Sequence, residues 1–300
     1  MVAQAVALSP GRVWWSAVRP ATLAASVAPV LAATAVALHE GALNAWAGFA
    51  ALVVALAVQL GVNFANDYSD FKRGADTAAR VGPVRASASG VVRPEHVRLA
   101  ALAAFAFAGL VGLALSLLID WRLLFVGAAC LLAGWLYTGG PRPYGYLGLG
   151  ELFVFLFFGL VATCGTVYVE TLRVSPLAVL VGCGVGFLAT AILVLNNLRD
   201  IDTDRAAHKR TLATLIGRQP TRYLLVALAF AAFAVPIVIF VASLAPAAIL
   251  ASLLAIVMVA PTVRTALVTT KAPALIGALK QMAAAELAYA LLLMIGLVLL

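Results

Sequence analysis

The chain of 300 residues is 64% hydrophobic and 11% charged, with a formal net charge of +8. A soluble domain carries about 25% charged residues, so this composition excludes an ordinary soluble protein. Long apolar runs alternate with short turns and leave no room for a soluble domain beside them. We therefore expect an all-α integral membrane protein that forms a single polytopic domain over residues 1–300.

Hydropathy predicts nine membrane-spanning helices, because each apolar run is close to the length of about 20 residues that crosses a bilayer. The spans are expected at 22–38, 43–66, 97–119, 121–138, 149–169, 175–197, 221–243, 245–261 and 273–298. Only residues 243–246 separate the seventh span from the eighth, so these two could instead form one kinked hairpin.

The basic residues predict how the chain is oriented. With the N-terminus in the cytoplasm, Arg122 and Arg173 fall outside, Lys280 lies within the ninth span, and the rest of the 20 lysines and arginines fall inside. This bias follows the positive-inside rule. We expect a plasma-membrane protein with a cytoplasmic N-terminus, cytoplasmic polar loops and an outer C-terminus.

A polar stretch ends the second span. If the helix continues through it, 100° per residue places four polar side chains on one stripe: Gln59, Asn63, Asn66 and Asp70. Asp67 falls beside this stripe. Amides and carboxylates at membrane depth are costly and indicate a functional site.

A second polar stretch ends the sixth span. Asn196, Asp200 and Asp204 follow one another at i, i+4, whereas Asp202 points away. Helix capping or loop solvation explains a single aspartate, but not two such stripes, each at the end of a span. Two carboxylate-lined helix ends could share divalent cations.

Long polar loops follow both stretches, at residues 71–96 and 200–220. Both stretches therefore place carboxylates and basic residues in the same region. A diphosphate explains this combination, because Mg²⁺ would bridge it to the carboxylates while Lys and Arg bind the remaining phosphate oxygens. Alternatively, any single basic residue could only anchor the cytoplasmic rim of the protein to anionic lipid. A third inner loop reads first as a tight turn, and its Arg142 and Tyr144 are secondary site candidates.

The motifs Asn66-Asp67-x-x-Asp70 and Asn197-x-Arg199-Asp200-x-x-x-Asp204 resemble the two Asp-rich motifs of the UbiA superfamily of intramembrane prenyltransferases. The turn Arg85-x-x-x-Ser89-Gly90 is similar to the turn that follows the first motif of that family. Residues 66–71, 74–76 and 196–204 resemble the branch that acts on 1,4-dihydroxy-2-naphthoate in menaquinone synthesis. The superfamily pattern has a third carboxylate where this chain has Gly74, and Asp76 is its candidate substitute.

The resemblance implies about nine helices in a ring around a central cavity, capped by the two cytoplasmic loops and open sideways to lipid. The implied reaction joins a polyprenyl diphosphate to 1,4-dihydroxy-2-naphthoate, with loss of CO₂ and diphosphate. The expected catalytic residues are Asp67, Asp70, Asp200 and Asp204. The expected Mg²⁺ ligands are Asn66, Asp67, Asp70, Asp76, Asn197, Asp200 and Asp204. The expected diphosphate-binding residues are Arg85, Ser89, Arg142 and Lys209, and the expected acceptor-binding residues are Gln59, Asn63 and Tyr144.

Two alternatives stay open. The same fold could prenylate another aromatic acceptor, such as 4-hydroxybenzoate or homogentisate. A membrane transporter, which also places carboxylates within the bilayer, is the alternative from a different class, but it favours polar residues at the midplane and internal repeats. The sequence assigns no role to Asp202, Lys280 or Glu286.

Overall fold

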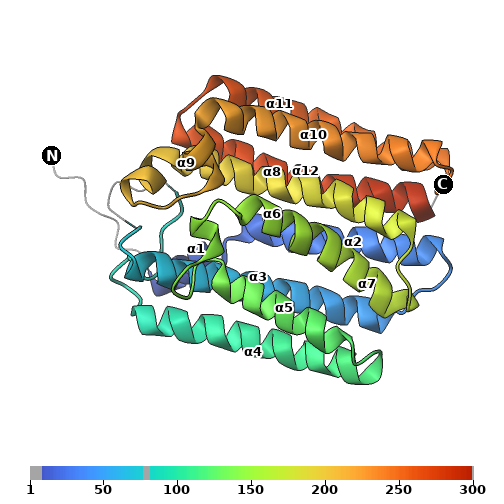
Figure 1. Cartoon of the computed structure of the whole chain (residues 1–300), viewed down its shortest axis with the longest axis horizontal. Coiled ribbons are helices and arrows are strands. Elements are labelled where there is room, and N and C mark those ends of the chain that lie inside the picture. The colour runs from blue at the N-terminus through green and yellow to red at the C-terminus, as the bar shows by residue number, and fades with distance from the viewer. Residues whose placement is uncertain (1–8, 77–81, 299–300) are drawn as a thin grey trace.

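In the computed structural model, residues 9–76 and 82–298 are described, and their regular elements are all helices (Figure 1). Residues 1–8, 77–81 and 299–300 lie outside this description, and Arg80 of the first polar loop is among them. The elements are α1 (Pro10–Val18), α2 (Pro20–His39), α3 (Ala45–Lys72), α4 (Pro94–Leu118), α5 (Leu123–Leu136), η1 (Tyr144–Tyr146), α6 (Gly150–Val154), η2 (Phe155–Val161), α7 (Ala162–Thr171), α8 (Pro176–Ala206), α9 (Leu212–Ile216), α10 (Arg218–Val241), η3 (Ala247–Ala255), α11 (Ile256–Val268) and α12 (Ala272–Val298).

All nine predicted spans correspond to helical segments. Among the described residues, eight segments are long and apolar enough to cross a membrane, and α5 is the shorter ninth. Its 14 residues rise about 21 Å at 1.5 Å each, less than the hydrocarbon thickness of about 30 Å. The seventh and eighth predicted spans are separate segments, because α10 ends at Val241 and η3 begins at Ala247.

Both polar stretches continue their helices. The second and sixth spans were expected to end near residues 66 and 197, yet α3 runs to Lys72 and α8 to Ala206. The conditional prediction of a helical stripe on each is therefore confirmed. These two long helices carry polar groups beyond the apolar part of the bundle, toward the end where α1, α9 and the polar loops lie (Figure 1).

A cavity of about 510 Å³ lies inside the bundle. Its walls come from α2 through α8, and α12 adds only Leu279 among the described residues. Helices α10 and α11 pack on the side of α8 and α12 that faces away from the cavity (Figure 1). The expected central cavity is present, and the helices of the first two-thirds of the chain form nearly all of its wall.

The segment η2 is a π-helix that forms one side of the cavity. Gly159 in this segment lies directly against α8, since a Cβ there would approach the Cα of Gly186 to 2.6 Å. The wider turn carries Phe157 and Phe158 to the cavity wall. π-helical turns inside α-helices are frequent at functional sites.

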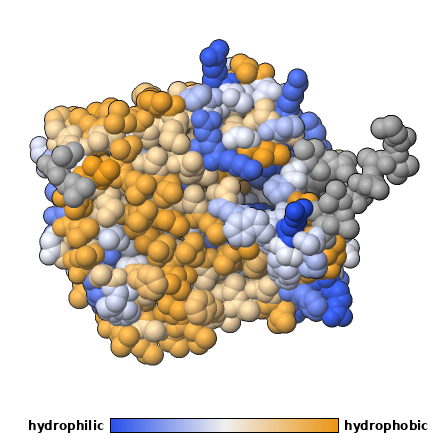
Figure 2. Space-filling model, turned by 180° about the vertical axis from the view of Figure 1, so that it is seen from behind, coloured by the Kyte–Doolittle hydropathy of each residue, from blue (hydrophilic) through white to orange (hydrophobic). Residues whose placement is uncertain are grey.

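The outer surface is broadly apolar, with hydrophilic residues gathered at one end (Figure 2). Large side chains such as Phe107, Phe125, Phe230 and Val241 are exposed on it. Water-soluble monomers rarely expose apolar surface on this scale, so these side chains face lipid. The protein is a multi-pass membrane protein.

Candidate active site

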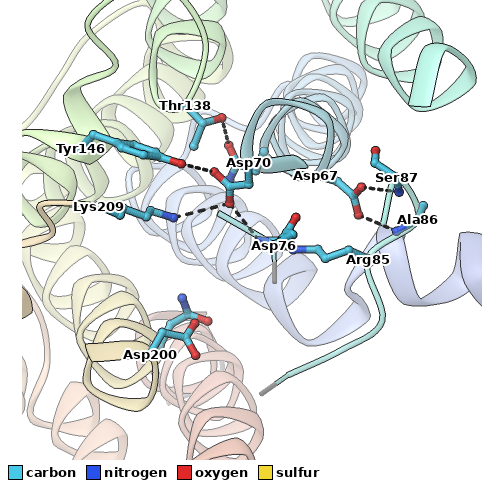
Figure 3. Close-up of polar contacts among 12 residues, drawn as sticks. Asp67, Asp70, Asp76, Arg85, Ala86, Ser87, Thr138, Tyr146, Asp200 and Lys209 are labelled. Carbon is cyan, nitrogen blue, oxygen red and sulfur yellow. Dashed lines mark hydrogen bonds and ion pairs between the residues drawn. The ribbon is translucent and has the colours of Figure 1, made fainter. Parts of the chain in front are cut away.

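The two polar stripes meet at one end of the same cavity. From α3, the cavity is lined by Gln59, Asn63, Asn66 and Asp70, and from α8 by Asn196, Asn197, Asp200 and Asp204. Stretches about 130 residues apart in sequence therefore share one site. Figure 3 shows Asp70 and Asp200 on separate helices across this space.

Asp70 is the centre of the polar contacts. Its side chain is 2% exposed and accepts hydrogen bonds from the Tyr146 hydroxyl at 2.8 Å and from Arg85 Nη2 at 3.1 Å. Lys209 Nζ lies 3.5 Å from the same carboxylate. Donors from three different loops thus converge on one buried carboxylate, which stabilises their arrangement around it.

Arg85 links the two carboxylates of the first polar region. Its Nε lies 3.3 Å from Asp76 Oδ1, while Nη2 contacts Asp70. Arg85, Asp76 and Lys209 all line the cavity. The predicted neighbourhood of carboxylates and cations is therefore present, with the opposite charges paired to one another.

Arg199 occupies the second acidic stripe. Its side chain is 4% exposed and pairs with Asp200 through two nitrogens. It also donates to Asn196 Oδ1 at 2.9 Å. An arginine fork on a carboxylate fixes the orientation of both groups, so Asp200 is held with its charge compensated at the cavity wall.

The amides of both motifs are fixed by buried partners. Asn66 Oδ1 accepts from the Thr138 hydroxyl at 2.7 Å, and Asn197 Nδ2 donates to Glu151 Oε1 at 2.9 Å. The Asn66 contact leaves a lone pair of its oxygen available, because an amide oxygen has two. These partners come from the loop after α5 and from α6, the short segments between the two motifs.

Asp67 departs from the expected placement. It is fully buried and is not one of the residues that line the cavity. Its two carboxylate oxygens accept the backbone N–H groups of Ala86 and Ser87, each at 2.8 Å. Figure 3 shows its side chain turned from the Asp70 side of α3 toward the loop that carries Arg85.

Two of the four expected diphosphate-binding residues lie off the cavity wall. Arg142 is exposed and does not line the cavity. Ser89 also lies outside the lining; its hydroxyl donates to Ala86 O at 2.7 Å and accepts from Val91 N at 3.1 Å, so it closes a turn. Arg85 and Lys209 do line the cavity.

Deeper in the cavity, Gln59 and Asn63 join a polar shelf with α2. Gln59 Nε2 donates to Asn63 Oδ1 at 3.1 Å and to Thr22 Oγ1 at 3.2 Å, and Asn63 Nδ2 donates to the same hydroxyl at 3.1 Å. Ser26 and Arg19 line the cavity beside them. Arg19, between α1 and α2, has a left-handed backbone conformation with φ of 52°.

Tyr144 lines the cavity through its ring. Its hydroxyl donates to Ala133 O at 2.9 Å, and its ring stacks on Phe153 with centroids 4.0 Å apart. Phe157 continues this stack at 5.9 Å from Phe153. The three rings form a continuous aromatic part of the cavity wall.

Comparison with known proteins identifies the family of this chain. The model of the UbiA prenyltransferase family matches residues 26–276. The chain belongs to the UbiA prenyltransferase family.

Curated members of the UbiA family are similar over most of their length. A 1,4-dihydroxy-2-naphthoate octaprenyltransferase from Mycobacterium leprae is 46% identical over 230 residues, which cover 77% of this chain and 78% of that one. The protein of the same name from Mycobacterium tuberculosis is 48% identical, covering 70% and 72%. The one from Escherichia coli is 35% identical, covering 72% of each.

Solved UbiA structures share the fold. The apo structure of a UbiA homolog from Aeropyrum pernix K1 superposes with a TM-score of 0.62 at 17% identity, covering 96% of this chain and 98% of that one. A UbiA homolog from Archaeoglobus fulgidus, bound to DMAPP and Mg²⁺, superposes with a TM-score of 0.59 at 15% identity, covering 94% and 99%. At these identities the likeness concerns the fold alone.

The donor set of this UbiA site fits a hard cation. Its cavity-facing groups are carboxylate and amide oxygens from two helices, the ligands that Mg²⁺ prefers. Within residues 9–76 and 82–298, no three acidic, histidine or cysteine side chains enclose a metal site by themselves. Mg²⁺ is usually held by one or two carboxylates together with substrate phosphates, and two facing acidic rims suit that arrangement.

Several site residues were not selected from the sequence. Tyr146 and Thr138 come from the third inner loop, and Glu151 from the start of the fifth predicted span. Glu151 carried a signal, because a carboxylate at the start of an apolar span needs a partner. Arg199 belongs to the second motif, and its position next to Asp200 did not reveal a pairing between adjacent residues.

The open residues now have places. Asp202 is 78% exposed at its side chain and pairs with Arg218 Nη2 at 2.9 Å, so it points away from the site as predicted. Lys280 is exposed on α12. Glu286 is fully buried within the bundle and does not line the cavity.

Tyr146 provides a pH-dependent contribution to stability. Burial, reinforced by the charge of Asp70, raises the pKa of its hydroxyl above the ordinary value. The stabilisation it provides is therefore complete below the unfolded-state pKa of about 10 and declines as pH rises above that value. We expect Tyr146→Phe to lower the unfolding temperature at pH 8, and its deficit to shrink between pH 10 and 11. Thermal unfolding in detergent measures this, with Tyr223→Phe on the exposed face of α10 as control; a deficit that stays constant to pH 11 contradicts it.

Proposed function

We propose that the protein transfers a polyprenyl group from polyprenyl diphosphate to 1,4-dihydroxy-2-naphthoate with loss of CO₂ and diphosphate, in a Mg²⁺-dependent reaction that yields the demethylated menaquinol. The observation that carries this proposal is a long apolar cavity with acidic and basic side chains concentrated at one end. Such a cavity suits a substrate with a charged head and a long apolar tail. Three relatives at 35–48% identity bear the name of an enzyme for this acceptor.

The metal ligands in this proposal are the oxygen donors that face the cavity. Asp70 and Asn66 contribute from α3, and Asp200 and Asp204 from α8; Asp76 and Asn197 stand beside them. Mg²⁺ bound there would supply charge neutralisation for the departing diphosphate. The residues themselves hold two acidic rims at a fixed orientation, since Asp70 and Asp200 are both locked by charge-assisted hydrogen bonds.

Arg85 and Lys209 are the proposed diphosphate-binding cations. Both line the cavity, and both are within reach of Asp70. Because their positive charges are already placed at the end of the cavity where negative charge would develop as the allylic C–O bond breaks, they would stabilise the leaving group. Lys209 lies 5.1 Å from the ring centroid of Tyr146, a cation–π contact that helps to hold it at the rim.

The apolar wall would hold the prenyl tail and exclude water from the allylic cation. Lining residues on α3 extend from Asp70 back to Ala51, a rise of about 28 Å at 1.5 Å per residue. On α5, Leu124 and Val126 line the cavity and are exposed. An opening toward lipid along α5 would let a long tail enter from the bilayer.

The acceptor in this proposal lies between the polar shelf and the reacting carbon. Gln59 Oε1, a buried acceptor without a hydrogen-bond partner among the described residues, suits an acceptor hydroxyl, and Asn63 holds Gln59 in this orientation. The guanidinium of Arg19 suits the acceptor carboxylate, and the ring of Tyr144 offers a stacking surface. The ring carbon that bears the carboxylate attacks the prenyl cation. The electrons of the bond to CO₂ then return to the ring, so the step needs no catalytic base.

The proposed setting is the plasma membrane, with the charged end of the cavity in the cytoplasm. The N-terminal helix α1 and the polar loops lie at that end, and the chain ends at the other (Figure 1). The concentration of Lys and Arg in those loops supports this orientation.

The function is tested by supplying the purified protein in vesicles with labelled polyprenyl diphosphate and one of three acceptors. We expect 1,4-dihydroxy-2-naphthoate to be prenylated with release of CO₂, and 4-hydroxybenzoate and homogentisate to react far more slowly. Chelation of Mg²⁺ should stop the reaction. Preferential coupling to another acceptor contradicts the proposed substrate, and turnover in the presence of chelator contradicts the metal.

The carboxylates are tested separately. Asp70→Asn and Asp200→Asn should each lower the turnover number by about 10²-fold or more, as loss of a group that stabilises developing charge does. Asp202→Asn is the matched control on the outer face of α8 and should retain activity. Elution as a single symmetric species shows that a variant is folded. Near-normal turnover of Asp70→Asn or Asp200→Asn contradicts the assignment of that residue as a metal ligand.

Two cations with different placements give the next prediction. Lys209→Gln should raise KM for polyprenyl diphosphate about tenfold or more, because a charge-assisted contact to phosphate is lost. Arg142→Gln should leave KM within about twofold, since that side chain is exposed and away from the cavity. Initial rates against donor concentration measure both; equal effects would contradict the selective role of Lys209.

A further inference from the structure

We propose that Asp67 is a positioning residue that fixes the loop carrying Arg85, and that it is not a ligand of the metal. This inference rests on the proposed function, because it assigns the aspartates of one motif to different tasks. Asp67 and Asp70 then have different roles, whereas the family resemblance implies that both are metal ligands.

The contacts of Asp67 are those of a backbone anchor. Oδ2 accepts from Ala86 N and Oδ1 from Ser87 N, both at 2.8 Å. Two consecutive peptide N–H groups on the two oxygens of one ionised carboxylate form a pair of charge-assisted hydrogen bonds. An asparagine cannot reproduce them, because its amide NH₂ group is a donor and would face a donor.

The surroundings hold Asp67 in this orientation. Asp67 and Ala86 are fully buried and Ser87 is 3% exposed. Ala86 packs in an apolar cluster with Phe64 on α3 and Val97 on α4. A carboxylate in such a place would be strongly destabilising if its partners were removed, so rotation of Asp67 toward the cavity is unfavourable.

A second anchor holds the same loop from the other side. Ser16 on α1 donates its hydroxyl to Val84 O at 2.9 Å. The backbone is therefore held at Val84 by α1 and at Ala86 and Ser87 by α3. Arg85, the residue between these anchors, is the one whose side chain enters the cavity.

The orientation of Arg85 is the outcome of this anchoring. Its side chain is 9% exposed, with Nη2 at 3.1 Å from Asp70 and Nε at 3.3 Å from Asp76. Nε, beside Asp76, and Nη1 are both buried without a hydrogen-bond partner among the described residues. A guanidinium with unused donors at a cavity wall suits a phosphate oxygen. Fixing the backbone on both sides lowers the entropic cost of holding it there.

Asp70 makes the contrast within the motif. It lies three residues further along α3, lines the cavity and contacts three cationic or hydroxyl donors. In Figure 3 the two carboxylates leave α3 in different directions. Asp67 therefore acts on the diphosphate through Arg85, whereas Asp70 faces the metal directly.

The test compares Asp67→Asn, Asp70→Asn, Arg85→Gln and the double variant Asp67→Asn/Arg85→Gln in the full-length protein. Mn²⁺ binding is followed by electron paramagnetic resonance at saturating inorganic diphosphate. Amide hydrogen exchange is followed over residues 84–89. Steady-state kinetics give KM for polyprenyl diphosphate, and Asp202→Asn serves as the matched control.

We expect Asp67→Asn to leave the Mn²⁺ dissociation constant within about twofold, while the amides of Ala86 and Ser87 exchange about tenfold faster or more. KM should rise as it does in Arg85→Gln, and the double variant should be no worse than Arg85→Gln alone, because both changes remove one interaction. Ser16→Ala, which loosens the loop without touching a carboxylate, should shift exchange and KM in the same direction by less.

The outcomes separate the two proposals. If Asp67→Asn weakens Mn²⁺ binding as much as Asp70→Asn does, or if its effect on KM adds to that of Arg85→Gln, the positioning role is wrong. If Asp67→Asn fails to fold, an unchanged loop and KM in Ser16→Ala overturn it. If Asp70→Asn leaves Mn²⁺ binding intact, the metal site of the proposed function fails instead.

Discussion

A carboxylate at the end of an apolar cavity has to be compensated, because an isolated buried charge is far costlier than a paired one. This requirement organises the polar end of the protein. Asp70 accepts hydrogen bonds from donors in three loops, and Asp200 accepts them from the guanidinium of Arg199. Asp67 accepts hydrogen bonds from two peptide N–H groups. The loops are placed by the carboxylates they neutralise. Acidic residues therefore have a structural task here before any substrate arrives.

The same constraint explains how distant segments become one site. In their described parts, the loop after α3, the loop after α5 and the loop after α8 share no extended secondary structure beyond one isolated bridge between Leu147 and Arg210. They meet because Arg85, Tyr146 and Lys209 all contact Asp70. A single side chain of α3 thus joins three segments that are spread over residues 85–209 of the sequence.

Helical periodicity predicted much of this arrangement. Once α3 and α8 continue through their polar stretches, a period of 3.6 residues places Asn63, Asn66 and Asp70 on one line, and the cavity lies along that line. The outward direction of Asp202 followed from the same periodicity, the positions of the spans followed from hydropathy, and the central cavity was implied by the family resemblance. The family resemblance supplied the chemistry that spacing alone left open.

The remaining contacts depend on how irregular segments fold back, and local patterns do not encode that. Periodicity placed Asp67 beside the stripe, and only the path of residues 84–87 shows that a loop occupies that side. Arg142 and Lys209 are both basic loop residues, yet only Lys209 lines the cavity. That α10 and α11 do not line the cavity could not be predicted for another reason. These helices are as apolar as the helices of the cavity wall, so hydropathy does not distinguish contact with lipid from contact with a cavity.

The same ion pairs explain how the proposed metal site remains stable at the edge of a membrane before a substrate binds. Every carboxylate that faces the cavity from the first motif has a cation beside it, supplied by a loop. With a diphosphate and Mg²⁺ bound, Asp70 and Asp76 would be neutralised by the metal, and Arg85 and Lys209 would be available to the phosphate oxygens. In this proposal ionic partners are exchanged within one buried network, so the carboxylates and cations would remain paired. Keeping Arg85 in place through this exchange requires an anchor outside the exchanging set, and Asp67, which faces the backbone and not the cavity, meets that requirement.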